Sequence, residues 1–303
     1  MKIHKNAIAL MLSVLTAGAA SAADYTVTVE PNYPPAQAQQ VYKPLLDYLS
    51  KSTGHRFILK TAGNYHVYWR DLRGGVVTDF AFEEAHFTEY RANRQRFSPI
   101  VRVADPTKFT LLVDANNAAA GANGLIGHRI ASMSAPSLGY LLLGELYQNP
   151  IAQPEIQSVA ASWKDGVEMV FAGETDGAMV PGYIAQTYPN LVPVATSRDF
   201  IGRAFSASPK VPADVRKKVG DALLRLHRDK ALYDVISELG ATQFVPATSA
   251  DYAGSERLLR GVFGYQAIRG KTVPVQTTAP AAPPGAKPAT TSQGFSVKAE
   301  RGG

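Results

Sequence analysis

Short strand-like runs alternate along this chain with segments whose apolar residues recur at helical spacing. Residues 25–29 (Tyr-Thr-Val-Thr-Val) alternate between apolar and polar positions as a half-buried strand does. From Val41 to Leu49, apolar residues recur three and four positions apart, and Gly54 then supplies a helix stop signal. A strand followed by a helix is therefore predicted over residues 25–54, an order typical of α/β proteins.

The same alternation continues for two hundred residues in two βαβ series. Further strands are predicted at 57–59, 79–82, 109–113, 129–133, 156–159, 177–180 and 204–207, with a short extended run at 192–194. Further helices are predicted around 68–72 and 90, over 138–147, around 167–170, and over 212–228, 230–239 and about 251–263.

This order predicts two α/β lobes. The first would comprise residues 23–107 and 203–270, and the second residues 108–202. The chain would cross out of the first lobe near 105–110 and return near 195–205, and both crossings would act as hinges. A ligand is expected between the lobes, near strand ends and helix N-termini.

Both ends of the chain differ from this body. Residues 1–22 combine two lysines, a short apolar stretch and the small-residue pattern Ala20-Ser21-Ala22, which predicts a signal peptide cleaved after Ala22. No cysteine follows, so a bacterial lipid anchor is not expected there. Residues 271–303 are rich in Pro, Ala, Thr and Gly and are predicted to form a disordered tail.

Most of the formal charge of +6 belongs to those ends. Once residues 1–22 and 271–303 are removed, the body keeps 25 basic and 24 acidic residues. We therefore expect no nucleic-acid partner. The absence of cysteine excludes disulfides, thiol nucleophiles and cysteine-ligated metals.

The first candidate ligand segment is residues 134–140, between a predicted strand and a predicted helix. Ser134 and Ser137 supply hydroxyls at the helix start, and Gly139, which follows Leu138, lets a ligand approach the backbone closely. Free N–H groups and the helix dipole complete a site for an oxyanion. An ordinary capped helix explains the same residues.

The second candidate segment follows the strand at 79–82. Glu83, Glu84 and His86 stand at a strand end, where ligands meet such lobes, and suit a cation or a ligand amine. A metal site would use the same groups, but the spacing identifies no third ligand. The alternative is a pair of acids that stabilises a helix N-terminus.

Single residues at other strand ends complete the candidate site. Tyr33 and Tyr65 follow the first two strands, and Ser162 with Trp163 precedes a second-lobe helix. Asp176 enters the strand at 177–180. Aromatic groups at strand ends line ligand clefts, although burial in a core is the default for any one of them.

No catalytic motif accompanies these residues. The sequence has no nucleophile elbow, no His-Glu-x-x-His and no dinucleotide fingerprint, so neither an enzyme nor a cofactor is expected. A hydrolase that uses Ser137 with His86 would need those two groups in direct contact.

Several segments together resemble phosphate/phosphite/phosphonate-type substrate-binding proteins of ABC transporters, which have the type 2 periplasmic binding fold. The resemblance lies in residues 42–49 with 53–54, 78–81, 134–139 and 171–178, and it covers residues 25 to about 265. It implies two lobes, each a mixed sheet flanked by helices, that close on a small ligand. It also implies a periplasmic monomer that delivers this ligand to a membrane permease.

The resemblance also implies residue roles. Ser134, Ser137 and the nearby backbone would hold the oxyanion, Tyr33 would line the cleft, and Asp176 would supply an acid. Two departures stand out: Ser162-Trp163 replaces a typical Ser-His pair, and Glu83-Glu84 stands where the family is small and neutral. Two carboxylates oppose an oxyanion unless the ligand also carries an amine.

The function expected from the sequence is thus capture of a small anionic or zwitterionic ligand for ABC-type uptake. A binding protein that reports to a membrane sensor kinase is the first alternative. A hydrolase or a metal-binding protein on the same scaffold is the second.

Overall fold

A computed structural model describes residues 22–266 of the chain. The predicted signal peptide, apart from its last residue, and the predicted tail at 271–303 lie outside the described residues. Among the described residues, no helix combines the length and apolar character needed to cross a membrane.

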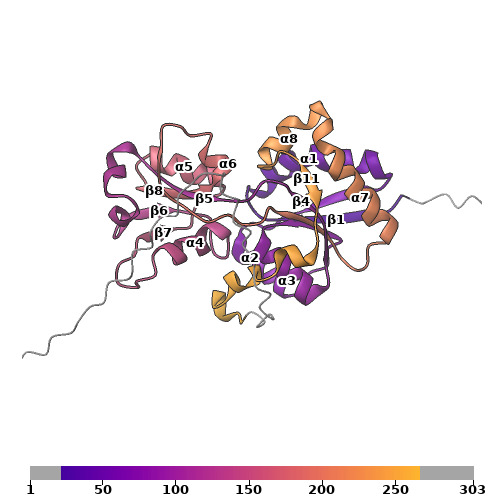
Figure 1. Ribbon diagram of the computed structural model, residues 1–303, viewed down its shortest axis with the longest axis horizontal. Coiled ribbons are helices and arrows are strands. Elements are labelled where there is room, and N and C mark those ends of the chain that lie inside the picture. The colour runs from indigo at the N-terminus through magenta and orange to yellow at the C-terminus, as the bar shows by residue number, and fades with distance from the viewer. Residues whose placement is uncertain (1–21, 267–303) are drawn as a thin grey trace, which may run out of the picture. The chain divides into compact units, whose positions relative to one another are not determined.

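Six strands form the first mixed sheet (Figure 1). They are β1 (Asp24–Val29), β2 (Arg56–Lys60), β3 (Phe80–Glu83), β4 (Ser98–Val103), β10 (Ala204–Ala207) and β11 (Phe244–Pro246). Their order across the sheet is β11-β4-β10-β3-β1-β2. β1 is parallel to β2 and β3, whereas β10 lies between β3 and β4 and is antiparallel to both.

Five strands form the second mixed sheet. They are β5 (Phe109–Val113), β6 (Arg129–Ala131), β7 (Glu155–Gln157), β8 (Gly177–Pro181) and β9 (Val192–Thr196), in the order β7-β6-β8-β5-β9. β6 is parallel to β7 and β8, and β5 is antiparallel to β8 and β9.

Helices flank both sheets. The first sheet carries α1 (Pro35–Thr53), α2 (Tyr65–Arg73), α3 (Ala85–Gln95), α7 (Ala213–Arg225) and α8 (Tyr233–Glu238), and the second carries α4 (Leu138–Leu146), α5 (Trp163–Phe171) and α6 (Gly182–Ala185). The chain passes between the sheets twice, at 104–108 and at 197–203. The predicted α/β architecture with two lobes is confirmed. The exact lobe boundaries and the hinge action of the crossings stay predictions.

Local sequence signals explain most helix limits. α1 begins at Pro35, a residue that suits the first turn of a helix. It ends before Gly54, whose φ of 77° gives the left-handed C-cap. Asn64, Ser137 and Ser162 cap α2, α4 and α5, because each side chain accepts a hydrogen bond from a backbone N–H three residues on.

The structure differs from the sequence prediction in two strands and two helices. The short helix α6 was not predicted. β4 and β11 were not predicted, and β4 carries Pro99, a residue that argues against a strand. The helix expected at 251–263 consists instead of short 3₁₀ turns. Gly254 and Gly261 have φ values of 90° and 82°, and this conformation interrupts a helix at each of them.

Two apolar cores hold these layers. One lies between the first sheet and α1, α7 and α8. The other fills the second lobe and continues, without interruption, into aromatic residues of α2 and α3, including Trp69 and Phe87. The second core therefore joins both lobes through packed side chains.

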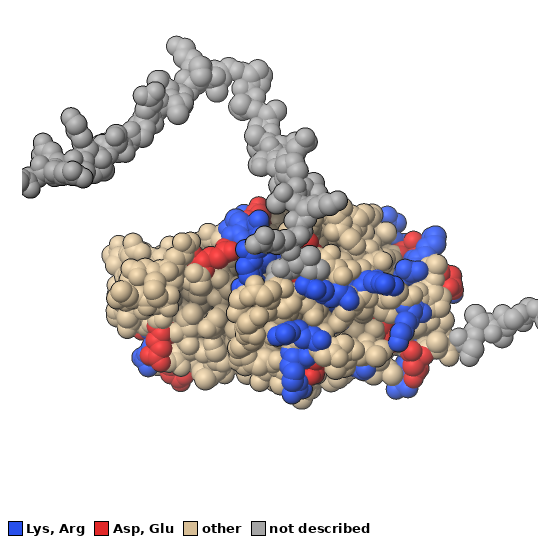
Figure 2. All heavy atoms as spheres, turned by 90° about the horizontal axis from the view of Figure 1, so that it is seen from below, with Lys and Arg blue, Asp and Glu red and all other residues tan. Residues whose placement is uncertain are grey.

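Figure 2 shows basic side chains spread over the face of the molecule that it presents. Several are engaged by their own neighbours. Arg70 pairs with Asp71 at 2.7 Å, Arg94 lies 3.6 Å from Glu256, and Arg73 lies over the ring of Trp69. Several basic side chains therefore already have a partner within the protein.

Gly202 fixes the contact between the two crossings and provides a test of it. A Cβ at this position would lie 2.3 Å from the carbonyl oxygen of Val103 and 2.6 Å from that of Asp105. Because backbone atoms must move, we expect Gly202→Ala to lower the free energy of unfolding by about 1–3 kcal/mol in urea denaturation.

Gly144→Ala is the matched control. A Cβ at Gly144 in α4 meets open space, and alanine is the better helix former, so this variant is expected to be neutral or stabilised. Equal effects of the two substitutions would show that the crossings are not packed against each other.

Candidate functional site

The strand register brings three charged residues to one edge of the first sheet. Val29 of β1 pairs with Phe82 of β3, and Glu83 of β3 pairs with Ala204 of β10. Glu30 and Glu84 therefore follow the carboxyl ends of two parallel strands, and Arg203 precedes the start of the antiparallel strand between β3 and β4. The carboxyl edge of parallel strands is the usual place for a ligand in such sheets.

The corresponding edge of the second sheet carries the other candidates. The turn at 132–137 follows β6 and leads into α4, and Tyr183 follows β8. Phe109, at the start of β5, pairs with Pro181, which places Lys108 at this edge as well. β10 in the first sheet and β5 in the second both begin at this edge. Each is preceded there by a basic residue, Arg203 before β10 and Lys108 before β5.

Three polar contacts join the two edges. Trp163 Nε1 donates to Asn32 Oδ1 at 2.9 Å, and the hydroxyl of Tyr65 donates to the same oxygen at 2.7 Å. Lys164 Nζ donates to both carboxylate oxygens of Glu238 at 3.0 and 3.1 Å.

The third contact joins His86 Nε2 to the carbonyl oxygen of Pro136 at 3.1 Å. Since a carbonyl can only accept, Nε2 carries the proton. Burial lowers the pKa of His86 to about 3, against the opposing effect of the Pro136 carbonyl, so the ring is neutral. Its Nδ1 is then an acceptor, and this buried atom has no partner among the described residues.

A cavity of about 1040 Å³ opens beside these contacts. Its lining comes from both lobes: Glu84, Arg203 and α8 on one side, and Lys108, Lys164 and Tyr183 on the other. The ring of Tyr183 packs against Gly240, where a Cβ would lie 2.4 Å from the ring. A space of this size holds a small organic ligand.

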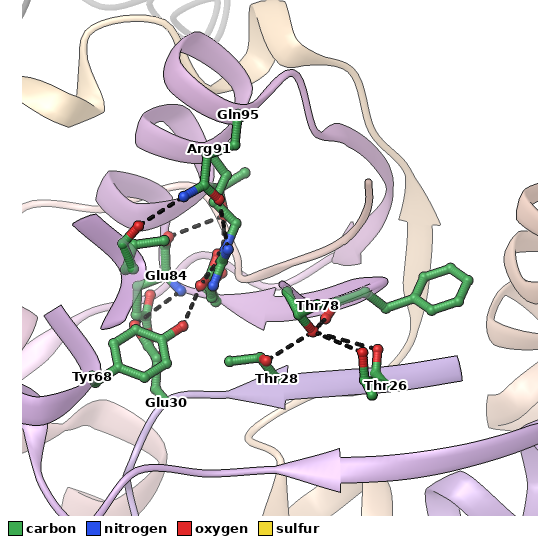
Figure 3. A network of polar contacts seen from close by, with 12 residues as sticks. Thr26, Thr28, Glu30, Tyr68, Thr78, Glu84, Arg91 and Gln95 are labelled. Atoms are coloured by element: carbon green, nitrogen blue, oxygen red, sulfur yellow. Dashed lines mark hydrogen bonds and ion pairs between the residues drawn. The ribbon is translucent and has the colours of Figure 1, made fainter. Parts of the chain in front are cut away.

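Glu30 and Glu84 are both buried and lie against each other. The backbone N–H of Glu84 donates to Glu30 Oε1 at 3.3 Å (Figure 3). Burial raises the pKa of Glu84 to about 7, although the charge of Arg203 and the hydroxyl of Thr107 lower it. Burial, together with the charge of Glu84, raises the pKa of Glu30 well above its ordinary value.

Arg203 is the cation nearest to this pair. Its Nε lies 3.9 Å from Glu84 Oε1, its Nη2 donates to the carbonyl oxygen of Leu239, and its guanidinium lies 4.7 Å from the ring centre of Phe82. Burial lowers the pKa of Arg203, but Tyr183 and the two carboxylates more than offset this, so the side chain stays charged.

Glu83 belongs to a separate, structural network. Arg91 Nε donates to both of its oxygens at 2.7 and 2.8 Å, and the hydroxyl of Tyr68 donates to Oε1 (Figure 3). Both partners of the ion pair are almost fully buried. Neighbouring side chains therefore occupy the oxygens of Glu83, and its predicted ligand role stays a prediction.

Both the sequence and the fold of this chain match known proteins. The family model described as "ABC transporter, phosphonate, periplasmic substrate-binding protein" matches residues 27–252, most of the chain. The chain belongs to this family. A search of curated proteins finds no match.

Solved structures agree on the fold. PhnD1 from Prochlorococcus marinus in complex with methylphosphonate is 14% identical, with a TM-score of 0.67 over 80% of this chain and 99% of that one. A binding component of a Pseudomonas aeruginosa phosphonate transporter is 12% identical, with a TM-score of 0.65 over 78% and 86%. A Xanthomonas citri protein bound to ATP is 17% identical, with a TM-score of 0.57 over 78% and 98%.

Membership of this family confirms three predictions made from the sequence: the resemblance, the type 2 periplasmic binding fold and the solute-binding function. The protein is a substrate-binding component of ABC uptake, which takes a small-molecule ligand and works with a permease. Its family is periplasmic.

The predicted oxyanion segment, residues 134–139, is buried by contacts within the protein. Ser137 is fully buried, donates to the carbonyl oxygen of Met133 at 3.0 Å and accepts from the N–H of Tyr140 at 3.3 Å. Leu138 is buried, and a Cβ on Gly139 would lie 3.0 Å from the Trp163 ring. The carbonyl of Ser134 accepts the N–H of Ser137. The segment contacts the other lobe but does not line the cavity.

The remaining predicted residues divide into two groups. Tyr33 donates to Glu238 Oε1 at 2.7 Å, so Tyr33, Tyr65 and Trp163 all lie where the lobes meet, and Ser162 caps α5 beside them. Asp176 lies elsewhere. It precedes β8, whose other end reaches the cavity, and it accepts the N–H of Arg129 and lies 3.5 Å from His128.

Of the predicted site residues, Glu84 alone is in the lining of this cavity. The sequence analysis did not single out the lining residues Arg203, Lys164 and Glu238. It also did not single out Glu30, which is buried beside Glu84 but is not in the lining. Glu30 follows its strand as Glu84 follows β3, so the same strand-end argument would have found it. The others depend on an antiparallel strand and on contacts between distant segments, for which the sequence carries no local signal.

The structural role of Glu83 can be tested by comparing two carboxylates. Glu83→Gln leaves Arg91 buried without its counter-charge, so we expect the free energy of unfolding to fall by about 3 kcal/mol or more. Asp47→Asn breaks the exposed pair with Lys43, whose side chains are 69% and 63% exposed, and should cost about 0.5 kcal/mol or less. Denaturant titration measures both, and similar small losses would return Glu83 to the ligand site.

The raised pKa of Glu84 predicts a pH-dependent cost. A carboxyl with a higher pKa in the folded state destabilises the fold as the pH rises from about 4.5 to about 7, and the full cost remains above that. Glu84→Gln removes the titration, so its stability relative to wild type should improve by about 2–3 kcal/mol between pH 5 and pH 8. Glu168→Gln, an exposed control on α5, should show a constant difference over this range, and a flat profile for both would refute the expectation.

Proposed function

We propose that this protein captures a small oxyanion-bearing ligand of the phosphonate, phosphite or phosphate kind in the cavity between its lobes and delivers it to an ABC permease. The observation that carries the proposal is a cavity lined from both lobes beside contacts that hold the lobes together. A ligand in this position is enclosed only when the lobes close, which is the motion expected of such a fold.

The oxyanion has two candidate places. The first is the cavity, where Lys108, Lys164 and Lys230 supply positive charge. The second is the segment at 134–139, which does not line the cavity. Trp163 of the same lobe covers this segment, so an oxyanion would reach it only after the indole ring moves. The complexes with methylphosphonate and with ATP show that related folds take anions of different size, and a cavity of about 1040 Å³ exceeds the need of the smaller one.

Catalysis is not part of the proposal. The hydroxyl of Ser137 donates to Met133, and His86 donates to Pro136, so a hydrolase based on these two residues lacks its nucleophile–base contact. Within residues 22–266, no three acidic or histidine side chains cluster as metal ligands do.

The proposal also covers the route and the partner. We include export by the predicted signal peptide and action as a monomer, because the family is periplasmic. We retain a permease instead of a sensor kinase as the partner because the family description names ABC transport.

Calorimetry with the mature protein tests this proposal. After unfolding and refolding to remove bound ligand, we expect methylphosphonate, phosphite or phosphate to bind once per chain with Kd of about 1 μM or below, that is, about −8 kcal/mol. Lys164→Ala should weaken binding about tenfold, because it removes a lining cation and an interlobe ion pair. Lys217→Ala on α7 is the matched control and should change nothing. No heat and no melting shift with any of these oxyanions would contradict the proposal.

A further inference from the structure

Arginine side chains gather where α2, α3 and residues 255–265 pack together. The three segments meet through the rings of Trp69, Tyr90 and Tyr265, whose centres lie 5.1, 5.2 and 5.6 Å apart. α2 and α3 lie at the lower side of Figure 1, the side from which Figure 2 is seen, and Figure 2 shows basic side chains over that face. We give the name arginine face to the exposed arginines on these segments and at the C-cap of α3, which are Arg70, Arg73, Arg94, Arg96, Arg257 and Arg260.

Acidic side chains do not balance the arginine face. The same segments hold three of them, Asp71, Glu89 and Glu256, against the six exposed arginines. Glu256 is buried, and Glu89 accepts hydrogen bonds from the backbone N–H groups of Gly254 and Glu256. The imbalance is local, because residues 22–266 as a whole carry 24 basic and 24 acidic residues. Among these described residues, four arginines of the face have no carboxylate partner, namely Arg73, Arg96, Arg257 and Arg260.

Exposed apolar side chains border the arginines. Phe263 is 58% exposed, and its ring centre lies 5.2 Å from that of His66 in the first turn of α2. Val76 and Val77, shortly after α2, are 53% and 59% exposed. A contact with a phospholipid surface uses both kinds of side chain, because apolar groups enter the headgroup region while guanidinium groups meet phosphate oxygens. This combination favours a phospholipid surface over an acidic polypeptide.

The described part of the chain also ends at this face. The ring centre of Tyr265 lies 5.7 Å from the guanidinium carbon of Arg73 and 5.8 Å from that of Arg94. Residues 267–303, which lie outside the described residues, add five basic residues and one acidic residue in the sequence. The net positive charge that the chain carries at and beyond this face is therefore more than twice that of the face alone.

We propose that the arginine face is a contact surface for an anionic phospholipid membrane. Each basic side chain near such a surface changes the affinity about fivefold, so a few uncompensated arginines give a reversible contact and not an anchor. The permease of this family lies in a membrane, and a weak contact with the lipid around it raises the local concentration of the binding protein. α8, which lines the cavity, packs in the other core, so the contact leaves the cavity accessible.

Vesicle co-sedimentation with the full mature chain tests this surface. We expect vesicles with about 30% phosphatidylglycerol in phosphatidylcholine to bind the protein at least tenfold more tightly than pure phosphatidylcholine, and this binding to fall at least tenfold between about 50 and 300 mM NaCl. Combined Arg96→Gln, Arg257→Gln and Arg260→Gln should weaken it at least tenfold. The matched control removes three basic side chains from α7, through Arg216→Gln, Lys217→Gln and Lys218→Gln, and should change it less than threefold.

Further measurements separate this surface from folding, from the proposed function and from the end of the chain. The arginine variant should keep the wild-type melting temperature and oxyanion affinity, and Arg96→Gln alone repeats the vesicle comparison if the combined variant does not fold. Equal binding to both kinds of vesicle, or equal losses in the arginine and α7 variants, refutes the proposal. So does wild-type vesicle binding by the arginine variant when glutamine at the five basic positions of 267–303 abolishes binding. Retention on immobilised polyglutamate without vesicle binding would also overturn it and would assign the face to an acidic protein partner.

Discussion

Parallel strands of one sheet end at the same edge, and this constraint decides which side chains of the protein can meet. In the first sheet it brings Glu30 and Glu84 together, and the antiparallel β10 adds Arg203 at the same level. In the second sheet it gathers the α4 turn and Tyr183. The α4 turn contacts the first lobe directly through Pro136 and His86, while Tyr183 faces Glu84 and Arg203 across the cavity.

Burial makes this arrangement costly as well as specific. The carboxylates, the guanidinium and the surrounding tyrosines lie where charge is poorly solvated, so each group depends on the others. Glu83 and Arg91 illustrate the satisfied case, because each has its partner within hydrogen-bond distance. Glu30 and Glu84 illustrate the other case, because one oxygen of each has no hydrogen-bond partner among the described residues. Burial then raises the pKa of both carboxyl groups.

The sequence predicted the α/β architecture, the two lobes and most strands, because hydrophobic periodicity is a local property. It did not predict β4, which contains Pro99, or β11, which is three residues long, because their pairing depends on residues far away in the chain. In the site, strand-end reasoning singled out Glu84, which lines the cavity, and Asp176, which does not. Asp176 precedes its strand, so it lies at the edge of the sheet away from the cavity.

Two departures from the family pattern stand out in the site. They are Trp163 in place of a typical histidine, and Glu83-Glu84 after the strand β3. Trp163 covers the α4 turn and donates to Asn32, so the place implied for the oxyanion is filled by the protein itself. The free polar groups lie instead at Glu84 and along the cavity beside it. The fold of the family is retained. The charged groups that line the cavity come from both lobes, Glu84 and Arg203 from the first and Lys108 and Lys164 from the second. In this chain the accessible charges of the site therefore lie at the cavity and not at the covered α4 turn.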